Sequence, residues 1–225
     1  MILTIANRKG GTGKSTIALN LAAELARSRP HRERRLQPAS PPSPQERGLG
    51  GEVVLLSEDF AWPDTTEPGE FSTKLVKRAI RAKHEVLILD VPAHLPIDDA
   101  RALLNLATVA LVPLEPTPTA WSHAADILAA CPQALAVLSR VKPWREHRQF
   151  IAELRTSLGA PGSPGSLARI CSTIITERAI IAEATACGLP VRSLRPKSKS
   201  AQRARRASLA EFRQLIREVL SHAQD

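Results

Sequence analysis

Two adjoining segments near the start of the chain decide the fold: residues 2–6 (ILTIA) and residues 9–16 (KGGTGKST). The first is a short apolar run, which is typical of a buried β-strand. The second is rich in glycine, and after it Ile17, Leu21 and Leu25 recur at helical spacing. A strand, a glycine-rich turn and a helix that begins at Lys-Ser together predict a phosphate-binding loop (P-loop).

The residues of this loop have separate chemical tasks. Glycine tolerates backbone dihedrals that let a loop wrap closely around an anion. Successive amides and the N-terminus of the following helix then direct positive dipoles at phosphate. Lys14 is expected to reach the β- and γ-phosphates of ATP, and the Ser15 hydroxyl to bind Mg²⁺. The predicted nucleotide-binding residues are Gly10, Gly11, Thr12, Gly13, Lys14, Ser15 and Thr16.

Apolar runs alternate with helical patterns along the rest of the chain, which indicates βαβ units. Further strands are expected at residues 53–56, 86–89, 107–114, 134–138 and 170–175. Helices are expected at 71–83, at 121–130 and at the end of the chain, where one face holds Leu209, Phe212, Ile216 and Val219. The predicted fold class is α/β, a single P-loop NTPase domain with a mostly parallel sheet flanked by helices.

Length and composition predict one domain over residues 1–225, because a chain of this length is too short for two well-cored domains and a linker. Aromatic residues make up only 3% of the chain, so the core is expected to be aliphatic. Residues 30–51 cluster Pro, Ser, Arg and Gly without a periodic apolar residue. We predict that they form a disordered insertion in this domain.

Cysteine usage, the start of the chain and net charge indicate the protein's surroundings. Cys131, Cys171 and Cys187 are too scattered for a disulfide framework or a metal site, and are expected to be small buried hydrophobes. No secretion signal and no membrane-spanning apolar run is found, so a cytoplasmic location is expected. The net charge of +9 favours an acidic partner: nucleic acid, an acidic lipid surface or an acidic protein.

Asp90 is the second candidate for the nucleotide site. It follows the apolar run 86–89 and precedes Val91-Pro92-Ala93. An aspartate at the carboxyl end of a central strand is well placed to hold Mg²⁺, directly or through water. Asp90 and Ser15 are therefore the predicted magnesium residues.

The loop resembles the deviant Walker A motif of the ParA/MinD family. The plain P-loop pattern has glycine where this chain has Arg8, and the loop instead starts with a second lysine, Lys9. In that family the extra lysine crosses the interface of an ATP-bound dimer and touches the partner's nucleotide. The resemblance implies an ATP-dependent homodimer in which Lys9, Lys14 and Asp90 are the catalytic residues. Residues 90–93 resemble the family's switch region, with Ala93 in place of a second proline.

The resemblance extends over most of the chain, through residues 108–118, 138–140, 176–178, 184–191 and 196–202. Ser139 stands where relatives often have the asparagine of an Asn-Arg pair near adenine. The similarity is greatest to the small plasmid-partition type, which lacks an N-terminal DNA-binding domain. It implies an ATPase for plasmid or chromosome partition, nucleoid-associated in the cytoplasm and regulated by a separate centromere-binding adaptor protein.

One family element has no clear counterpart. ParA proteins carry Val-Asp-x-Asp-Pro-Gln after the second strand, and one of its aspartates positions the attacking water. In one interpretation residues 54–59 (VLLSED) are that strand, displaced by an insertion, with Glu58 or Asp59 as the surrogate. In the other, residues 53–56 are the next strand and the catalytic element is lost. We prefer the first, and predict secure ATP binding with weak ATP hydrolysis.

A basic stretch precedes and opens the last helix. Its cationic residues are Lys197, Lys199, Arg203, Arg205 and Arg206, with no acidic residue until Glu211. Phosphate contacts from such a cluster give affinity for DNA that is independent of base sequence. No aromatic residue is interleaved, which argues against stacking on single strands. The predicted partner is non-specific duplex DNA.

Two alternatives stay open. A MinD-like, membrane-cycling positioning ATPase needs an apolar amphipathic helix at its C-terminus, whereas here residues 209–220 are better explained as core and the chain ends in SHAQD. No membrane partner is therefore expected. The second alternative is an ATP-binding relative with impaired hydrolysis. A kinase that autophosphorylates tyrosine is excluded because the chain has no tyrosine.

Overall fold

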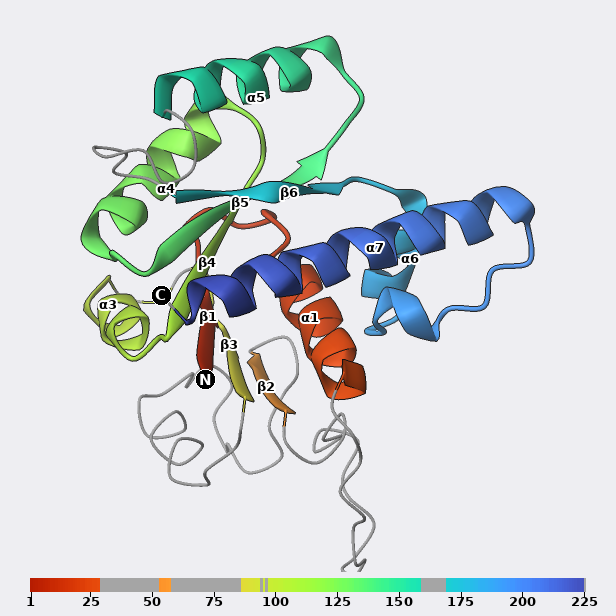
Figure 1. Cartoon of the computed structure of the whole chain (residues 1–225), viewed down its shortest axis with the longest axis horizontal. Coiled ribbons are helices and arrows are strands. Elements are labelled where there is room, and N and C mark those ends of the chain that lie inside the picture. Colours follow the sequence, from red (N-terminus) through yellow and green to blue (C-terminus); the bar gives the residue numbers. More distant parts are fainter. Residues whose placement is uncertain (29–52, 58–85, 94, 96, 159–168, 225) are drawn as a thin grey trace, which may run out of the picture.

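The computed structural model describes residues 1–28, 53–57, 86–93, 95, 97–158 and 169–224. Within these residues, six parallel strands form one sheet in the order β2-β3-β1-β4-β5-β6 (Figure 1). The strands are β1 (Ile2–Ile5), β2 (Val53–Ser57), β3 (Val86–Asp90), β4 (Val109–Leu114), β5 (Ala134–Val141) and β6 (Arg169–Thr176). The α/β fold class expected from the sequence is confirmed.

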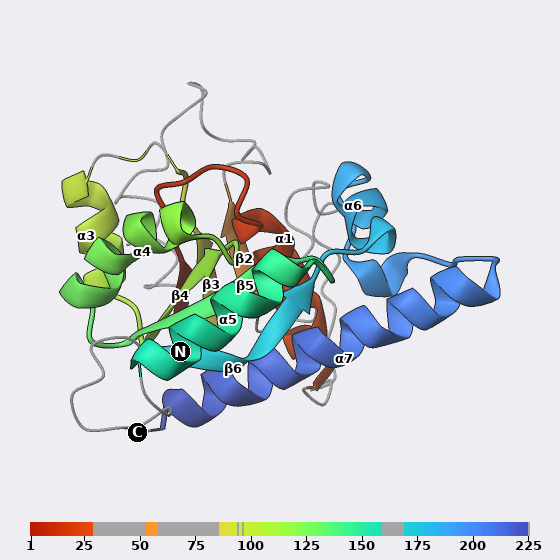
Figure 2. The same ribbon diagram turned by 90° about the horizontal axis from the view of Figure 1, so that it is seen from above.

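Helices cover both faces of the sheet and form two separate hydrophobic clusters with it. One cluster contains side chains of α1 (Lys14–Ser28), α6 (Ala179–Ala186), the 3₁₀ helix η1 (Val191–Ser193) and α7 (Lys199–His222). The other contains side chains of α3 (Ile97–Asn105), α4 (Pro118–Ala130) and α5 (Arg145–Leu158). Figure 2 shows the long helix α7 running beside β6, with its first turns projecting past α6.

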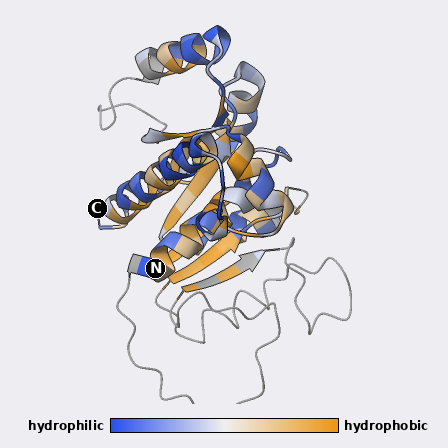
Figure 3. Cartoon of the chain, turned by 90° about the vertical axis from the view of Figure 1, so that its right-hand side faces the viewer, coloured by the Kyte–Doolittle hydropathy of each residue, from blue (hydrophilic) through white to orange (hydrophobic). Residues whose placement is uncertain are grey.

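Burial on both faces explains the continuous apolar sequences of the strands. β3 and β4 are buried at every position, and the strands are mostly orange in Figure 3. On α7, Leu209, Phe212, Ile216 and Val219 are all buried, which confirms the predicted apolar face. None of the helices that the structure describes is long and apolar enough to cross a membrane.

The expected elements differ from the observed ones mainly at their ends. β5 continues to Val141, and β4 begins at Val109 rather than at residue 107. Helices α3, α5 and α6 were not expected; α5 is rich in charged residues, which obscures its few apolar positions. The helix expected at 71–83 and the insertion expected at 30–51 lie outside the described residues. Cys131 and Cys171 are buried, but Cys187 is exposed because it lies just beyond the end of α6.

The strand order brings distant parts of the chain to one edge of the sheet. β1 is central, with Ile5 beside Asp90 of β3 on one side and beside Leu111 of β4 on the other. β5 follows β4, with Leu138 beside Leu114. The carboxyl ends of all these strands therefore meet, and ligands of open α/β sheets bind at this edge.

Candidate nucleotide-binding site

Glycine is required at two positions of the loop that follows β1. Gly11 has φ +74° and Gly13 has φ +86°, a region in which residues with a side chain are strained. Asn7 fixes the start of the loop: its Nδ2 donates to the carbonyl oxygen of Pro113 at 2.7 Å, and its Oδ1 accepts from the amide of Lys9 at 2.9 Å. Asn7 has no place in the P-loop pattern, so sequence reasoning missed it.

Lys14 opens α1 and lies across the loop. Its side chain is nearly buried, and Nζ donates to the carbonyl oxygen of Lys9 at 3.4 Å. Thr12 is fully buried, and its hydroxyl donates to the same oxygen at 3.4 Å. The first turn of α1 carries no acidic residue, so the positive end of its dipole is left for an anion.

A cavity of about 560 Å³ adjoins the loop. One side is formed by Gly11, Gly13 and residues 14–17, and the other by the ends of β5 and β6 and by α6. This volume is typical of small-molecule sites. Its lining combines apolar Ile175 and Ile181 with the polar residues Thr176 and Thr185.

Two residues at the end of β5 support the loop from outside the predicted site. Ser139 is buried, and its hydroxyl donates to the carbonyl oxygen of Thr12 at 2.7 Å. Arg140 donates from NH1 to the carbonyl oxygen of Gly11 at 2.9 Å. Ser139, which stands where relatives often have an asparagine near adenine, therefore binds the loop backbone. Sequence reasoning gave no sign of either contact.

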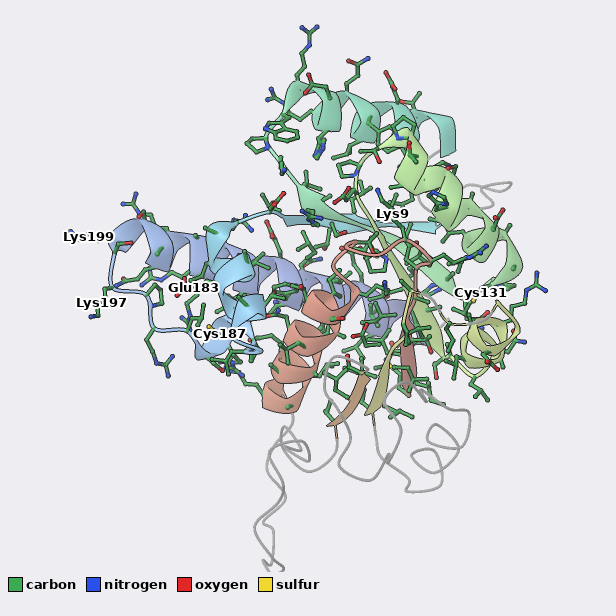
Figure 4. The ribbon with its side chains drawn as sticks, turned by 180° about the vertical axis from the view of Figure 1, so that it is seen from behind. Lys9, Cys131, Glu183, Cys187, Lys197 and Lys199 are labelled. Atoms are coloured by element: carbon green, nitrogen blue, oxygen red, sulfur yellow. The ribbon has the colours of Figure 1, made fainter. Side chains whose placement is uncertain are left out.

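Lys9 faces an acidic side chain of its own chain. Its Nζ lies 3.6 Å from Oε2 of Glu115, the residue that follows β4. Oε1 of the same carboxylate lies 2.7 Å from NH1 of Arg140. Figure 4 shows Lys9 on the loop, among side chains from the neighbouring strands.

Asp90 is the last residue of β3 and is buried. The hydroxyl of Ser57, at the end of β2, donates to its Oδ2 at 2.6 Å. Asp90 does not line the 560 Å³ cavity, although its strand adjoins the one that carries the loop. The surrogates Glu58 and Asp59 lie outside the described residues.

The oxygen donors available here fit magnesium better than a protein-caged metal. Mg²⁺ is usually held by one or two protein oxygens together with phosphate oxygens and water. The Ser15 hydroxyl and the Asp90 carboxylate are such donors. In the part of the chain that the structure describes, no group of three or more His, Cys, Asp or Glu side chains could hold a metal ion.

The basic cluster of the last helix lies away from the loop. Figure 4 shows Lys197 and Lys199 at one extremity of the molecule, far from Lys9. Both are exposed, as are Arg203 and Arg206. Ser198 caps the helix, its hydroxyl accepting from the amide of Ala201 at 3.2 Å.

Arg205 differs from the other four residues of the cluster. It is half-buried, and its guanidinium donates to the carbonyl oxygens of Val191 at 3.3 Å and Arg192 at 2.5 Å. These bonds tie α7 to η1. Two N–H donors of Arg205 are therefore used inside the protein, which the sequence pattern cannot show. Its contact with DNA stays a prediction.

The comparisons with known proteins agree with this arrangement. The family described as "CobQ/CobB/MinD/ParA nucleotide binding domain" matches residues 3–32, which include most of β1, the loop and α1. No curated protein matches the chain.

Solved structures of similar fold extend over nearly the whole chain. The septum site-determining protein MinD of Pyrococcus horikoshii, complexed with Mg-ADP, shares 17% identity at a TM-score of 0.54, covering 94% of this chain and 93% of its own. A putative plasmid partition protein of Borrelia burgdorferi, bound to AMPPNP, shares 14% identity at a TM-score of 0.58, covering 97% of each chain. The pnob8 ParA shares 12% identity at a TM-score of 0.60, covering 99% of this chain and 98% of its own. The chain therefore has the fold of the MinD and ParA structures, and its match to their nucleotide-binding family lies on the phosphate loop.

Proposed function

We propose that this chain is a ParA/MinD-type ATPase that binds Mg-ATP, closes into a dimer on ATP and holds non-specific DNA during plasmid or chromosome partition. The observation that carries the proposal is the glycine loop, with Lys14 lying across it, opening onto a 560 Å³ cavity. The presence of a second lysine in the loop, Lys9, is the reason for proposing the dimer. The exposed cations at the start of α7 are the reason for proposing DNA as the partner. A separate adaptor protein would regulate the cycle.

In this proposal the loop amides and the start of α1 surround the phosphates of ATP. The Lys14 ammonium leaves the carbonyl oxygen of Lys9 and binds phosphate oxygens, which are stronger acceptors because they are charged. The Ser15 hydroxyl and the Asp90 carboxylate would hold a magnesium ion, which would supply positive charge beside the phosphates. Lys9 completes the catalytic set from the second subunit.

Replacing Lys14 by alanine should lower ATP affinity at least about tenfold, because a charge-assisted contact to phosphate is lost. Isothermal calorimetry measures this directly. The Lys197→Ala variant removes an equal charge far from the loop and should bind ATP as the wild type does. Unchanged ATP affinity in Lys14→Ala would refute the assignment of the phosphate site.

ATP turnover should be slow, below about 1 s⁻¹, because no Asp-x-Asp-Pro-Gln sequence follows the second strand. Phosphate release from the wild type and from the double variant Glu58→Ala/Asp59→Ala measures it. Further loss in the double variant would identify one of the two as the group that positions water. Undiminished turnover would show that this group lies elsewhere.

One experiment tests the proposal as a whole: ATP-dependent dimerisation and DNA binding measured on one purified sample. Light scattering gives the dimer, and the anisotropy of a labelled duplex gives the DNA complex. Co-sedimentation with acidic liposomes tests the membrane-cycling alternative. The proposal expects DNA binding with ATP and no liposome binding, and the reverse result would favour the MinD-like alternative.

A further inference from the structure

A row of five side chains with alternating charge lies beside the phosphate loop. The row consists of Lys9, Glu115, Arg140, Glu177 and Lys142, in that spatial order. Beyond the Lys9 and Arg140 contacts to Glu115, Arg140 NH2 lies 3.7 Å from Glu177 Oε1, and Lys142 Nζ lies 3.4 Å from Glu177 Oε2. Residues that are distant in sequence meet here because β1, β4, β5 and β6 lie next to one another in the sheet.

Glu115 is the member that connects the loop to the rest of the row. Each of its two carboxylate oxygens takes one cation, Oε2 the ammonium of Lys9 and Oε1 the guanidinium of Arg140. Arg140 is fixed from a second side by its bond to the carbonyl oxygen of Gly11. The carboxylate is therefore held in place by Arg140, and Lys9 is the cation that can leave without disturbing the sheet.

The backbone at Arg140 supports a functional purpose for this arrangement. Its φ is +54°, and among the described residues it is the only non-glycine with a positive φ. Such strain persists only where the surroundings fix the conformation, and it is concentrated at functional sites. Here the strained residue presents one guanidinium to the phosphate loop, to Glu115 and to Glu177.

We infer that Glu115 is a positioning residue that holds Lys9 on its own subunit until ATP closes the dimer. The inference rests on the proposed function, in which Lys9 must reach a nucleotide held by the second subunit. That reach requires the Lys9–Glu115 pair to break in both subunits. Glu115 thereby opposes closure, and its charge sets how much ATP and protein are needed before dimers form.

The expected strength of the Lys9–Glu115 pair follows from the solvent exposure of the two side chains. The side chains of Lys9 and Glu115 are 35% and 25% exposed, so water and salt screen the pair and it changes an equilibrium by only a few-fold. Two pairs break per dimer, so the effect counts twice. Glu115→Gln keeps the shape and the acceptor for Arg140 but removes the charge. The dimer dissociation constant at saturating ATP should fall by about three- to tenfold.

The experiment measures this constant by analytical ultracentrifugation with saturating ATP and Mg²⁺, at low and at high salt. The matched control is Glu146→Gln, which removes one exposed carboxylate from α5 and should leave the constant at its wild-type value. The difference between the dimer dissociation constants of Glu115→Gln and the wild type should become smaller at high salt, because salt screens the Lys9–Glu115 pair. Structural damage caused by Glu115→Gln would weaken the dimer, so a tighter dimer cannot be explained in that way.

A second measurement distinguishes two explanations for tighter dimers in Glu115→Gln. Either Lys9 is released, or the loss of a negative charge strengthens ATP binding directly. In a Lys9→Ala background, which should stay monomeric, Glu115→Gln should leave ATP affinity within about twofold of the single variant. A rise in ATP affinity there equal to the gain in dimerisation would overturn the inference. The inference would also be overturned if the wild type dimerised with ATP and Glu115→Gln had an equal or higher dimer dissociation constant. A wild type that never dimerises with ATP would instead refute the proposed function, and the inference with it.

Discussion

Reversing the charge at Lys197, Lys199, Arg203 and Arg206 should abolish DNA binding while leaving ATP binding and dimerisation intact. All four side chains are exposed, and three of them lie on one helix face at spacings of four and three residues. The apolar face of α7, which includes Leu209 and Phe212, is untouched, so the fold should survive. Arg205 is kept because it bonds to the carbonyl oxygens of Val191 and Arg192.

The DNA complex should also require ATP and fall steeply with salt. The cluster of a single subunit has only four exposed cations, Lys197, Lys199, Arg203 and Arg206. A closed dimer would place two clusters on one duplex, so that the second contact becomes intramolecular. If the dimer neutralises about five to eight phosphates, log affinity should fall with log salt at a slope of about −4 to −7. Anisotropy of labelled duplexes of unrelated sequence, titrated at several salt concentrations, gives both quantities.

The control for this prediction reverses an equal charge elsewhere on the surface. Arg27, Arg145, Arg148 and Arg217 are exposed and lie outside the cluster. Changing all four to glutamate alters the net charge as much as reversing the four residues of the cluster does. It should weaken DNA binding only through the long-range electrostatic field, and this weakening should be smaller at high salt. Equal loss in both variants would contradict a localised DNA site. DNA binding that was as tight without ATP would contradict the dimer mechanism.

The second large effect is expected at Lys9. Lys9→Ala should abolish ATP-induced dimerisation while monomer ATP affinity stays nearly unchanged. The Lys9 ammonium pairs with Glu115 in the free subunit, and in the proposed dimer it would reach nucleotide only across the interface. Light scattering with and without ATP measures the dimer, and calorimetry measures the affinity. Lys197→Ala, at one extremity of the molecule and away from Lys9, should dimerise normally. Wild-type dimer formation in Lys9→Ala would exclude the cross-interface contact.

Local patterns in the sequence determined much of this protein. The strand, loop and helix over residues 2–25 are specified by apolar periodicity and by glycines whose φ values are positive at Gly11 and Gly13. The same patterns predicted the parallel sheet, Asp90 at the end of β3 and the buried face of α7. These features could be predicted because each depends on the spacing of residues within one element or on the order of elements along the chain.

Only the tertiary structure decided which residues surround the loop. Asn7 binds the end of β4, and Ser139 and Arg140 reach the loop from β5, because strand order makes neighbours of segments more than a hundred residues apart. The same holds for Glu115, which meets Lys9, and for Arg205, two of whose donors bind carbonyl oxygens of η1. The spacing of residues along the chain does not predict such contacts, because the packing of strands and helices across the domain brings these side chains together.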